Sequence, residues 1–218
     1  MGFINFLTSL FSYSTNCQSK ASVKSDRSHF QIRAAQPQDV TAMAEILADS
    51  FHSREGIWSW AYPLLRLGIH EDLQNRLRST SPYQVYLVAV DQIVGSTTDK
   101  LTGTVEMTVR SADSWASDRF TNGQMKSRYP YLSNLAVRPS DRRRGVAGQL
   151  LLNCEQIALS WGFQDIYLHV LENNYQARQL YFKLGYQLHH ADSSWSNWLF
   201  RRPRQLLLHK HINPNSTP

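Results

Sequence analysis

Between residues 131 and 186, two strand-like segments alternate with two helical segments. This order of elements constrains the fold more than any other feature of the sequence. The first helical segment follows Pro139 and ends at Gly162, and the second ends at Gly185, since glycine commonly follows a helix. One face of each helix is apolar, through Val146, Leu150, Leu151, Cys154 and Ala158 in the first and Ala177, Leu180, Tyr181 and Leu184 in the second. The pattern predicts a strand-helix-strand-helix unit with strands over 131–137 and 163–171.

More strands are predicted on both sides of this unit. Residues 84–90 and 101–110 are rich in Val, Thr and Tyr and predict an antiparallel pair. Residues 29–33 predict a first strand, and Pro37 then opens a helix whose apolar members are Val40, Met43, Ala44, Leu47 and Phe51. The remaining predicted elements are a helix over 71–78 and a last pair of strands over 186–190 and 205–211.

The composition fits one domain with short extensions. A chain of 218 residues, 42% of them hydrophobic, can bury one sizeable core. Its apolar runs are shorter than the roughly 18 to 20 residues that cross a bilayer, so no membrane-spanning segment is expected. Cys17 and Cys154 are too few for a disulfide scaffold or a structural zinc site, and we expect no metal.

The net charge of +6 lies at the two ends of the chain. Acidic and basic residues balance between Asp26 and Asp192, and the basic residues outside that interval are Lys20, Lys24, Arg201, Arg202, Arg204 and Lys210. A balanced body is not drawn to phosphate backbones. We therefore expect no specific nucleic-acid partner.

Residues 1–28 are rich in Ser and contain no acid before Asp26. We expect a poorly ordered extension there, followed by one domain over 29–212 and a tail over 213–218. No basic region precedes the apolar part of the extension, which argues against a secretory signal and favours the cytoplasm. The alternative is a plastid, because a Ser-rich, acid-poor segment is also compatible with a transit peptide.

A basic turn with glycines joins the strand at 131–137 to the next helix. It reads Val-Arg-Pro-Ser-Asp-Arg-Arg-Arg-Gly-Val-Ala-Gly over 137–148. Backbone N–H groups at a helix start bind anions, and Gly145, Ala147 and Gly148 leave room for close approach. The turn lacks the Lys-Ser/Thr ending of a P-loop and the Gly-x-Gly-x-x-Gly of a dinucleotide site. It indicates a pyrophosphate site, with an ordinary strand-to-helix turn as the alternative.

This turn resembles the Arg/Gln-x-x-Gly-x-Gly/Ala signature of the GNAT acetyltransferases, matched at Arg142, Gly145 and Ala147. Residues 174–186 resemble the second signature of that family, Asn-x-x-Ala-x-x-Leu-Tyr-x-x-x-Gly-Phe/Tyr. With both signatures in the family's order, the chain is identified as a member. The spacing is most similar to that of the ribosomal-protein N-terminal acetyltransferases and of plastid and cyanobacterial members. The resemblance implies an α/β chain of the α+β type, with a mixed, mostly antiparallel seven-stranded sheet, flanking helices and a V-shaped cofactor cleft.

The resemblance also implies a site for acetyl-CoA. The turn would hold the pyrophosphate, backbone N–H groups of 135–137 the acetyl and pantetheine part, and Asn174 the pantetheine arm. Tyr181 would donate a proton to the departing sulfur. The residues expected at the cofactor are Leu135, Ala136, Val137, Arg142, Arg143, Arg144, Gly145, Val146, Ala147, Gly148 and Asn174.

The general base departs from the family pattern. Ribosomal-type enzymes have Leu-Glu-Val in the strand before the second signature, and this chain has Leu168-His169-Val170. A histidine, whose ordinary pKa is about 6.5, suits proton removal near neutrality, and His169 is the first candidate. Glu106, on the strand beside the cleft, is the second, and a water relay is the third.

We expect an acetyl group to pass to a protein amine by direct attack in a ternary complex. N-terminal α-amines are favoured over lysine because they lose a proton more readily. Ribosomal proteins are candidate acceptors, and Trp58, Trp60, Trp195 and Trp198 are expected either to flank a bound peptide or to cap the core. The alternatives are a small-molecule amine acetyltransferase and a non-catalytic acyl-CoA-binding module. A monomer or a homodimer is expected.

Overall fold

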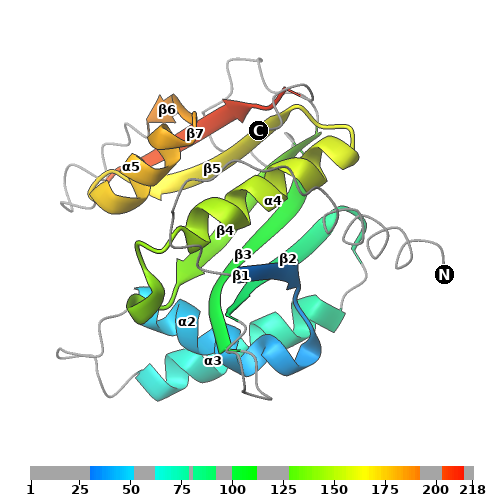
Figure 1. Ribbon diagram of the computed structural model, residues 1–218, viewed down its shortest axis with the longest axis vertical. Coiled ribbons are helices and arrows are strands. Elements are labelled where there is room, and N and C mark those ends of the chain that lie inside the picture. The colour runs from blue at the N-terminus through cyan, green and yellow to red at the C-terminus, as the bar shows by residue number, and fades with distance from the viewer. Residues whose placement is uncertain are drawn as a thin grey trace, which may run out of the picture.

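The computed structural model describes residues 30–51, 62–78, 81–91, 100–111, 128–191 and 203–213. Seven strands form one sheet in the order β1-β2-β3-β4-β5-β7-β6 (Figure 1). They are Phe30–Ala34 (β1), Gln84–Asp91 (β2), Lys100–Ser111 (β3), Arg128–Val137 (β4), Asp165–Leu171 (β5), Gln187–Ala191 (β6) and Gln205–His211 (β7). Neighbouring strands are antiparallel except for β4 and β5, which are parallel. The mixed, mostly antiparallel sheet predicted from the sequence is confirmed.

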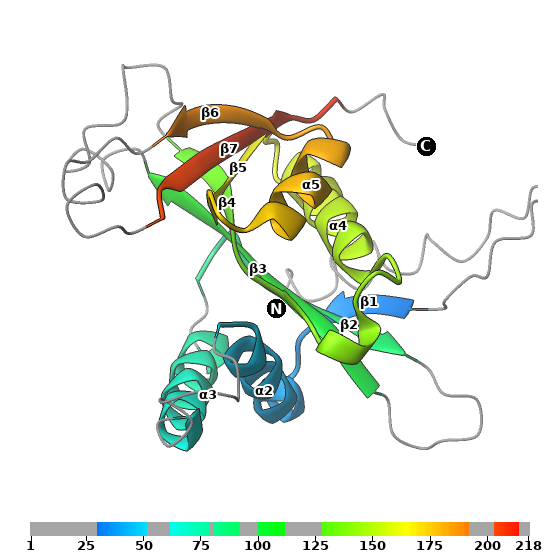
Figure 2. The same cartoon turned by 90° about the vertical axis from the view of Figure 1, so that its left-hand side faces the viewer.

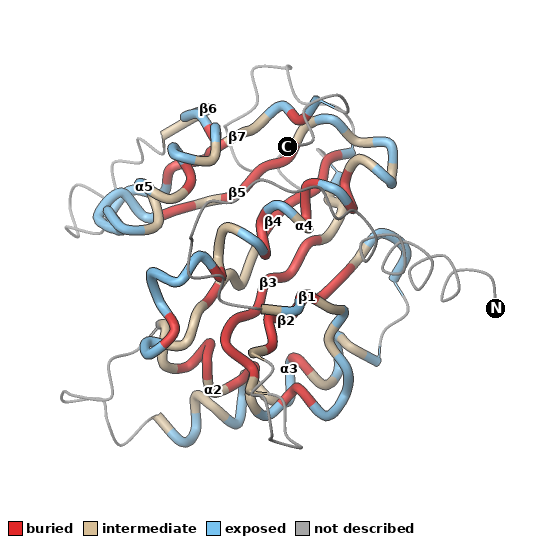
Figure 3. The backbone as a smooth tube through the Cα atoms, viewed as in Figure 1, coloured by how far each residue is buried: buried red, intermediate tan, exposed pale blue. Residues whose placement is uncertain are grey.

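Helices cover both faces of this sheet. They are Val40–Phe51 (α2), Tyr62–Arg78 (α3), Val146–Ser160 (α4) and Tyr175–Lys183 (α5), with short 3-10 turns at Pro37–Asp39 and Pro139–Asp141. Figure 2 shows α2 and α3 on one face and α4 and α5 on the other. The buried residues follow the central strands between these layers (Figure 3). We call the two sides the α2/α3 face and the α4/α5 face.

The apolar stripe of α4 forms the larger core. Its predicted members Val146, Leu150, Leu151, Cys154 and Ala158 are each at most 1% exposed. They pack with Leu87, Val105 and Met107 from β2 and β3. On the other face, Met43, Ala44 and Leu47 of α2 pack with Tyr86, Val88 and Val90 of β2. Because alternate residues of β2 point to opposite faces, this one strand contributes to both cores.

Helix α3 is longer than the sequence predicts. It begins at Tyr62 rather than at residue 71. Pro63 in its first turn is compatible with a helix start, but Leu64 and Leu67 are 71% and 56% exposed. An apolar stripe that faces outward breaks the helical periodicity on which the prediction depends. Only the second half, with Leu73 buried, carries the usual pattern.

A buried ion pair connects helix α4 with strand β7. Helix α4 packs on β1 to β4, whereas Lys210 belongs to β7. The ammonium of Lys210 lies 2.8 and 2.7 Å from the two carboxylate oxygens of Glu155 on α4, and both side chains are largely buried. A pair removed from water in this way is sensitive to the loss of either partner.

Gly103 of β3 allows α4 to approach the sheet closely. A Cβ there would lie 2.9 Å from Val146 Cγ1 and 3.1 Å from the carbonyl oxygen of Ala136. We expect Gly103→Ala to lower the free energy of unfolding by roughly 1–3 kcal/mol, as overpacking does. Gly68→Ala in α3 is the control, since a Cβ there meets nothing within 4 Å, and it should raise stability by about 0.5–1 kcal/mol. Urea unfolding measures both, and equal stabilities would contradict the close approach.

Candidate active site at the split between β4 and β5

Strands β4 and β5 pair at only two positions, Tyr131 with Tyr167 and Leu132 with Leu168. Both strands continue beyond these positions without pairing to each other. The N–H of Arg138 donates to Thr102 O, on the side of β3, at 2.8 Å. Because N–H groups alternate sides along a strand, the N–H of Val137 points to the β5 side. The segment 135–137 thus lies along the split, where the sequence predicts the acetyl group.

The start of α4 offers backbone donors without partners in the helix. Gly145 precedes the helix with φ of 87° and provides no side-chain cap. The helical hydrogen bonds begin with the N–H of Gln149, which donates to Gly145 O at 3.1 Å. The N–H groups of Val146, Ala147 and Gly148 come before it and have no intrahelical acceptor. A Cβ on Gly145 would meet nothing within 4 Å. Free donors, the helix dipole and open space are the features with which helix starts bind anions.

The three arginines of the turn differ in what they contact. Arg144 donates to Asp141 Oδ1 at 2.7 Å and to Asp91 Oδ2 at 3.2 Å. Arg142 Nε donates to Val137 O at 3.2 Å. Arg143 is exposed, has a left-handed φ of 66° and has no ion pair within the described ranges. The basic run in the sequence is therefore largely engaged in holding the turn.

Asp141 holds this turn against the sheet. Its side chain is 2% exposed and accepts hydrogen bonds from Lys100 Nζ at 3.0 Å and Ser140 Oγ at 2.9 Å, besides that from Arg144. Burial alone would raise the pKa of Asp141, but the hydrogen bonds from Lys100, Ser140 and Arg144 outweigh burial and lower it. The carboxylate stays ionised at neutral pH and fixes the residues that precede α4.

His169 is paired with a tyrosine that the sequence analysis missed. The Tyr131 hydroxyl lies 3.0 Å from Nδ1 of His169, at the point where β4 and β5 stop pairing. The guanidinium of Arg110 lies 3.6 Å above the Tyr131 ring. Burial raises the pKa of Tyr131, and Arg110 and a hydrogen bond from the backbone of His169 offset this only in part. The contact depends on how β4 and β5 are aligned with each other, and that alignment cannot be read from the sequence.

Tyr181 lies on the opposite face of the sheet from Tyr131. It belongs to the α4/α5 core, is 7% exposed, and its ring makes an edge contact with Tyr186 at 5.7 Å. Tyr131 instead packs with Tyr129, Tyr167 and Leu207. Burial, with a smaller effect of Tyr131, raises the pKa of Tyr181 above its ordinary value. Tyr181 is therefore protonated at neutral pH, as a proton donor must be.

The side chains of Glu106 and Asn174 form hydrogen bonds with other residues of the chain. Glu106 is 2% exposed and accepts from Asn134 Nδ2 at 2.7 Å and Tyr86 Oη at 2.9 Å. Asn174 precedes α5, and its Oδ1 accepts from the N–H of Ala177 at 3.2 Å. Asn174 is exposed, which is compatible with its predicted contact to a cofactor. The predicted tryptophans Trp58, Trp60, Trp195 and Trp198 lie outside the described residues.

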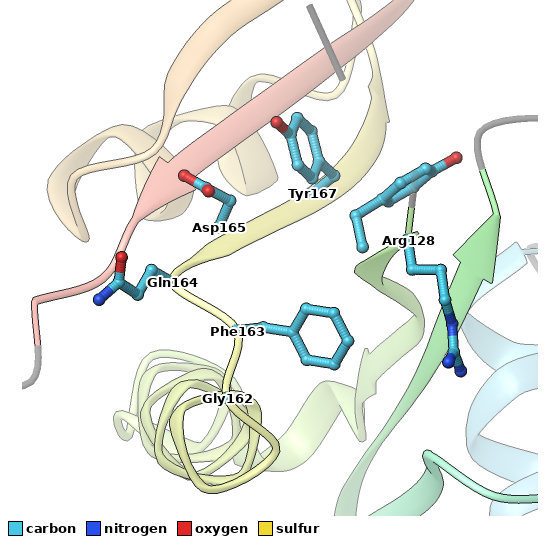
Figure 4. Close-up of a pocket in the computed structure, with 7 residues that line it drawn as sticks. Arg128, Gly162, Phe163, Gln164, Asp165 and Tyr167 are labelled. Carbon is cyan, nitrogen blue, oxygen red and sulfur yellow. The ribbon is translucent and has the colours of Figure 1, made fainter. Parts of the chain in front are cut away.

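A pocket lies at the starting ends of β4 and β5, away from the turn (Figure 4). Its volume is about 390 Å³. Two of its lining residues, Tyr129 and Tyr167, pack in one cluster with Tyr131. The residues that line it are Arg128, Tyr129, Gly162, Phe163, Gln164, Asp165 and Tyr167.

Among the residues that the structure describes, no three or more His, Cys, Asp or Glu side chains are grouped to hold a metal ion. Over the same residues, no helix combines the length and the apolar character needed to span a bilayer.

The chain is similar to known proteins in sequence and in fold. The chloroplastic GCN5-related N-acetyltransferase 7 of Arabidopsis thaliana is 37% identical over 78 residues, which cover 36% of this chain and 28% of that protein. The chloroplastic GCN5-related N-acetyltransferase 10 of the same plant is 25% identical over 179 residues, 80% of this chain and 68% of that protein. The chain thus spans only part of the length of these relatives. The crystal structure of Arabidopsis thaliana NAA60 in complex with acetyl-CoA aligns with a TM-score of 0.61 and 20% identity, over 85% of this chain and 99% of that one.

Residues 40–186 match the family model described as "Acetyltransferase (GNAT) family". The matched region runs from α2 to the end of α5 and includes the turn, the start of α4 and the split between β4 and β5. The shared region is thus the one that forms the candidate site, and the chain belongs to the GNAT acetyltransferase family.

Proposed function

We propose that the protein is an acetyl-CoA-dependent N-acetyltransferase that acts on protein amines. One observation carries this proposal. The split between β4 and β5 has an uncapped helix start at one end, the Tyr131–His169 pair on one face and Tyr181 on the other. These are the parts that acetyl transfer needs: an anion site, a proton acceptor and a proton donor.

Three parts of the chain would hold acetyl-CoA in this proposal. The N–H groups of Val146, Ala147 and Gly148 would hold the pyrophosphate, as would residues 142–145 through their backbone. Residues 135–137 would hold the thioester carbonyl, and Asn174 would orient the pantetheine arm. Acetyl-CoA supplies an acetyl group already activated as a thioester.

The amine attacks directly in this scheme. The acceptor nitrogen bonds to the acetyl carbon while its proton leaves through the Tyr131–His169 pair, and the carbon–sulfur bond breaks as Tyr181 gives its proton to the sulfur. The products are an amide and a free thiol. A covalent enzyme intermediate is not expected, because Cys154 is fully buried and burial raises the pKa of its thiol.

An N-terminal α-amine is the proposed acceptor, with lysine as the alternative. An α-amine has a pKa near 7.7–8.0, against about 10.4 for lysine, and needs less help from a base. The solved NAA60 structure carries a fold match only, but both plant relatives are named N-acetyltransferases, which supports the reaction. Ribosomal proteins remain candidate acceptors.

A substrate panel tests the reaction and the class of acceptor together. Acetyl-CoA consumption should be seen with peptides that have free N-termini and should fall when the N-terminus is blocked. Turnover of small amines alone would favour a small-molecule acetyltransferase. Binding of acetyl-CoA without turnover of any amine would favour a non-catalytic module.

The names of the relatives also bear on the compartment. Both are chloroplastic, which supports the plastid alternative and gives no support to the cytoplasmic expectation. We propose a plastid location. The segment 1–28, which would act as the transit peptide, lies outside the described residues.

Gly145 provides the first test of the cofactor site. Gly145→Asp places a negative charge beside the free N–H groups and should weaken acetyl-CoA binding by at least about tenfold, the change that 1.4 kcal/mol produces. The matched control is Gly162→Asp, at the other end of α4, where φ is also left-handed and a Cβ also meets nothing within 4 Å. Calorimetry measures the affinity of both folded variants. Equal affinities would remove the turn from the cofactor site.

Tyr181 provides the second test. Tyr181→Phe keeps the ring contact with Tyr186 and deletes only the hydroxyl. It should lower kcat by roughly 10²- to 10⁴-fold, the usual range for a general acid, while acetyl-CoA affinity is unchanged. Tyr186→Phe is the control, because it makes the same change in the neighbouring buried ring. A Tyr181→Phe enzyme at full rate would leave Tyr181 as a packing residue.

The pH profile tests the proton acceptor. If the amine proton leaves through His169, the rate at low acceptor concentration should rise with pH through an ionisation that belongs to the enzyme. His169→Ala should erase this limb, and Tyr131→Phe should displace it, because it removes the hydroxyl that contacts Nδ1. Acceptors whose amines differ in pKa distinguish an ionisation of the enzyme from an ionisation of the acceptor. A limb that moves with the acceptor belongs to the substrate and would rule out His169.

A further inference from the structure

Glu106 of β3 is the centre of a buried hydrogen-bond network that includes two side chains of β4. Oε2 accepts from Asn134 Nδ2 at 2.7 Å and from Ser133 Oγ at 3.3 Å. Oε1 accepts from Tyr86 Oη at 2.9 Å, and more distantly from Gln84 at 3.3 Å and Arg76 at 3.4 Å. A carboxylate has about four acceptor positions. With five donors around a side chain that is 2% exposed, little capacity remains to take a proton from a substrate.

The shortest of these hydrogen bonds, at 2.7 Å, comes from a residue in an unusual conformation. Asn134 has a left-handed φ of 54° inside β4. Thr104 pairs with Ala136 and Glu106 with Ser133, so β4 contains one more residue than β3 over this stretch. This is a β-bulge, which turns the residues that follow it. A left-handed φ is unfavourable for most L-residues, although Asn tolerates it better than others.

The bulge comes directly before 135–137, the segment that lies along the split. The conformation of Asn134 therefore sets the direction of the N–H groups proposed to hold the thioester. Glu106 belongs to β3, the strand that pairs with the bulged strand β4. Its carboxylate accepts a hydrogen bond from the Asn134 side chain. It also contacts Arg76 of α3 and Tyr86 of β2, so the bulge is held against two further elements.

We infer that Glu106 is a positioning residue for the acetyl group, and that it acts by holding Asn134 in its left-handed conformation. This inference rests on the proposed function, and it replaces the role of Glu106 as a candidate base. Burial of a carboxylate with one distant guanidinium is costly. The cost is understandable if the carboxylate fixes a backbone geometry that an apolar side chain cannot fix.

Two pairs of variants test this inference through acetyl-CoA affinity. Asn134→Gly removes the side-chain bond but adopts a left-handed φ freely, whereas Asn134→Ala removes the bond and disfavours that φ. Glu106→Gln keeps an acceptor for Asn134, whereas Glu106→Leu keeps similar bulk without one. The double variant Glu106→Leu/Asn134→Gly asks whether the two residues act through the same conformation.

We expect Asn134→Ala and Glu106→Leu to weaken acetyl-CoA binding by about tenfold, and Asn134→Gly and Glu106→Gln to change it by less than about threefold. In the Asn134→Gly background, Glu106→Leu should have little further effect. Thermal unfolding is measured beside each titration, so that affinities are compared only among variants that are fully folded at the titration temperature. If Glu106→Leu does not fold, the two Asn134 variants still decide the matter.

Distinct results separate this inference from the proposed function. Equal weakening by Asn134→Gly and Asn134→Ala, or no weakening by Asn134→Ala, overturns the inference alone. A Glu106→Gln protein that binds acetyl-CoA normally but loses turnover together with the pH limb also overturns it, because Glu106 would then be the base. A wild-type protein that does not bind acetyl-CoA removes the proposed function, and the inference falls with it.

Discussion

The parallel pairing of β4 and β5 at two positions is the constraint on which the rest of the structure depends. Strands β1 to β4 form one part of the sheet and β5, β7 and β6 the other. Among the described residues, only Tyr131–Tyr167 and Leu132–Leu168 connect the two parts by strand pairing. Few backbone bonds therefore resist separation of the two parts. The side chains that join them, such as Lys210 and Glu155 between β7 and α4, take on part of this task.

Buried carboxylates fix the geometry around the split. Asp141 holds the turn before α4, Glu106 contacts the bulge of β4, and Glu155 connects α4 to β7. Each is buried, and each accepts hydrogen bonds from an element that is distant in sequence. Buried ions of this kind contribute little net stability but penalise every arrangement in which a partner is lost. They are therefore suited to define one geometry of the site.

The sequence predicts the elements well where periodicity reflects burial, as in α4, whose apolar stripe is fully buried. It fails at the first half of α3, because the exposed Leu64 and Leu67 obscure the helical pattern. The family signatures locate the turn and Tyr181. They do not reveal that Arg144 contacts Asp91, or that Tyr131 contacts His169, because both contacts join residues far apart in sequence. The left-handed Asn134 has no sequence signal of its own.

The two faces of the sheet have separate packing partners at the split. Tyr181 belongs to the core beneath α4 and α5, whereas Tyr131 belongs to a small cluster with Tyr129, Tyr167 and Leu207 on the other face. Under the proposed mechanism, a substitution in that cluster alters the face of the sheet on which the acceptor would lie and leaves the packing of α4 unchanged. Such independence is the physical condition under which acceptor preference diverges among descendants of one gene while the acyl donor stays the same.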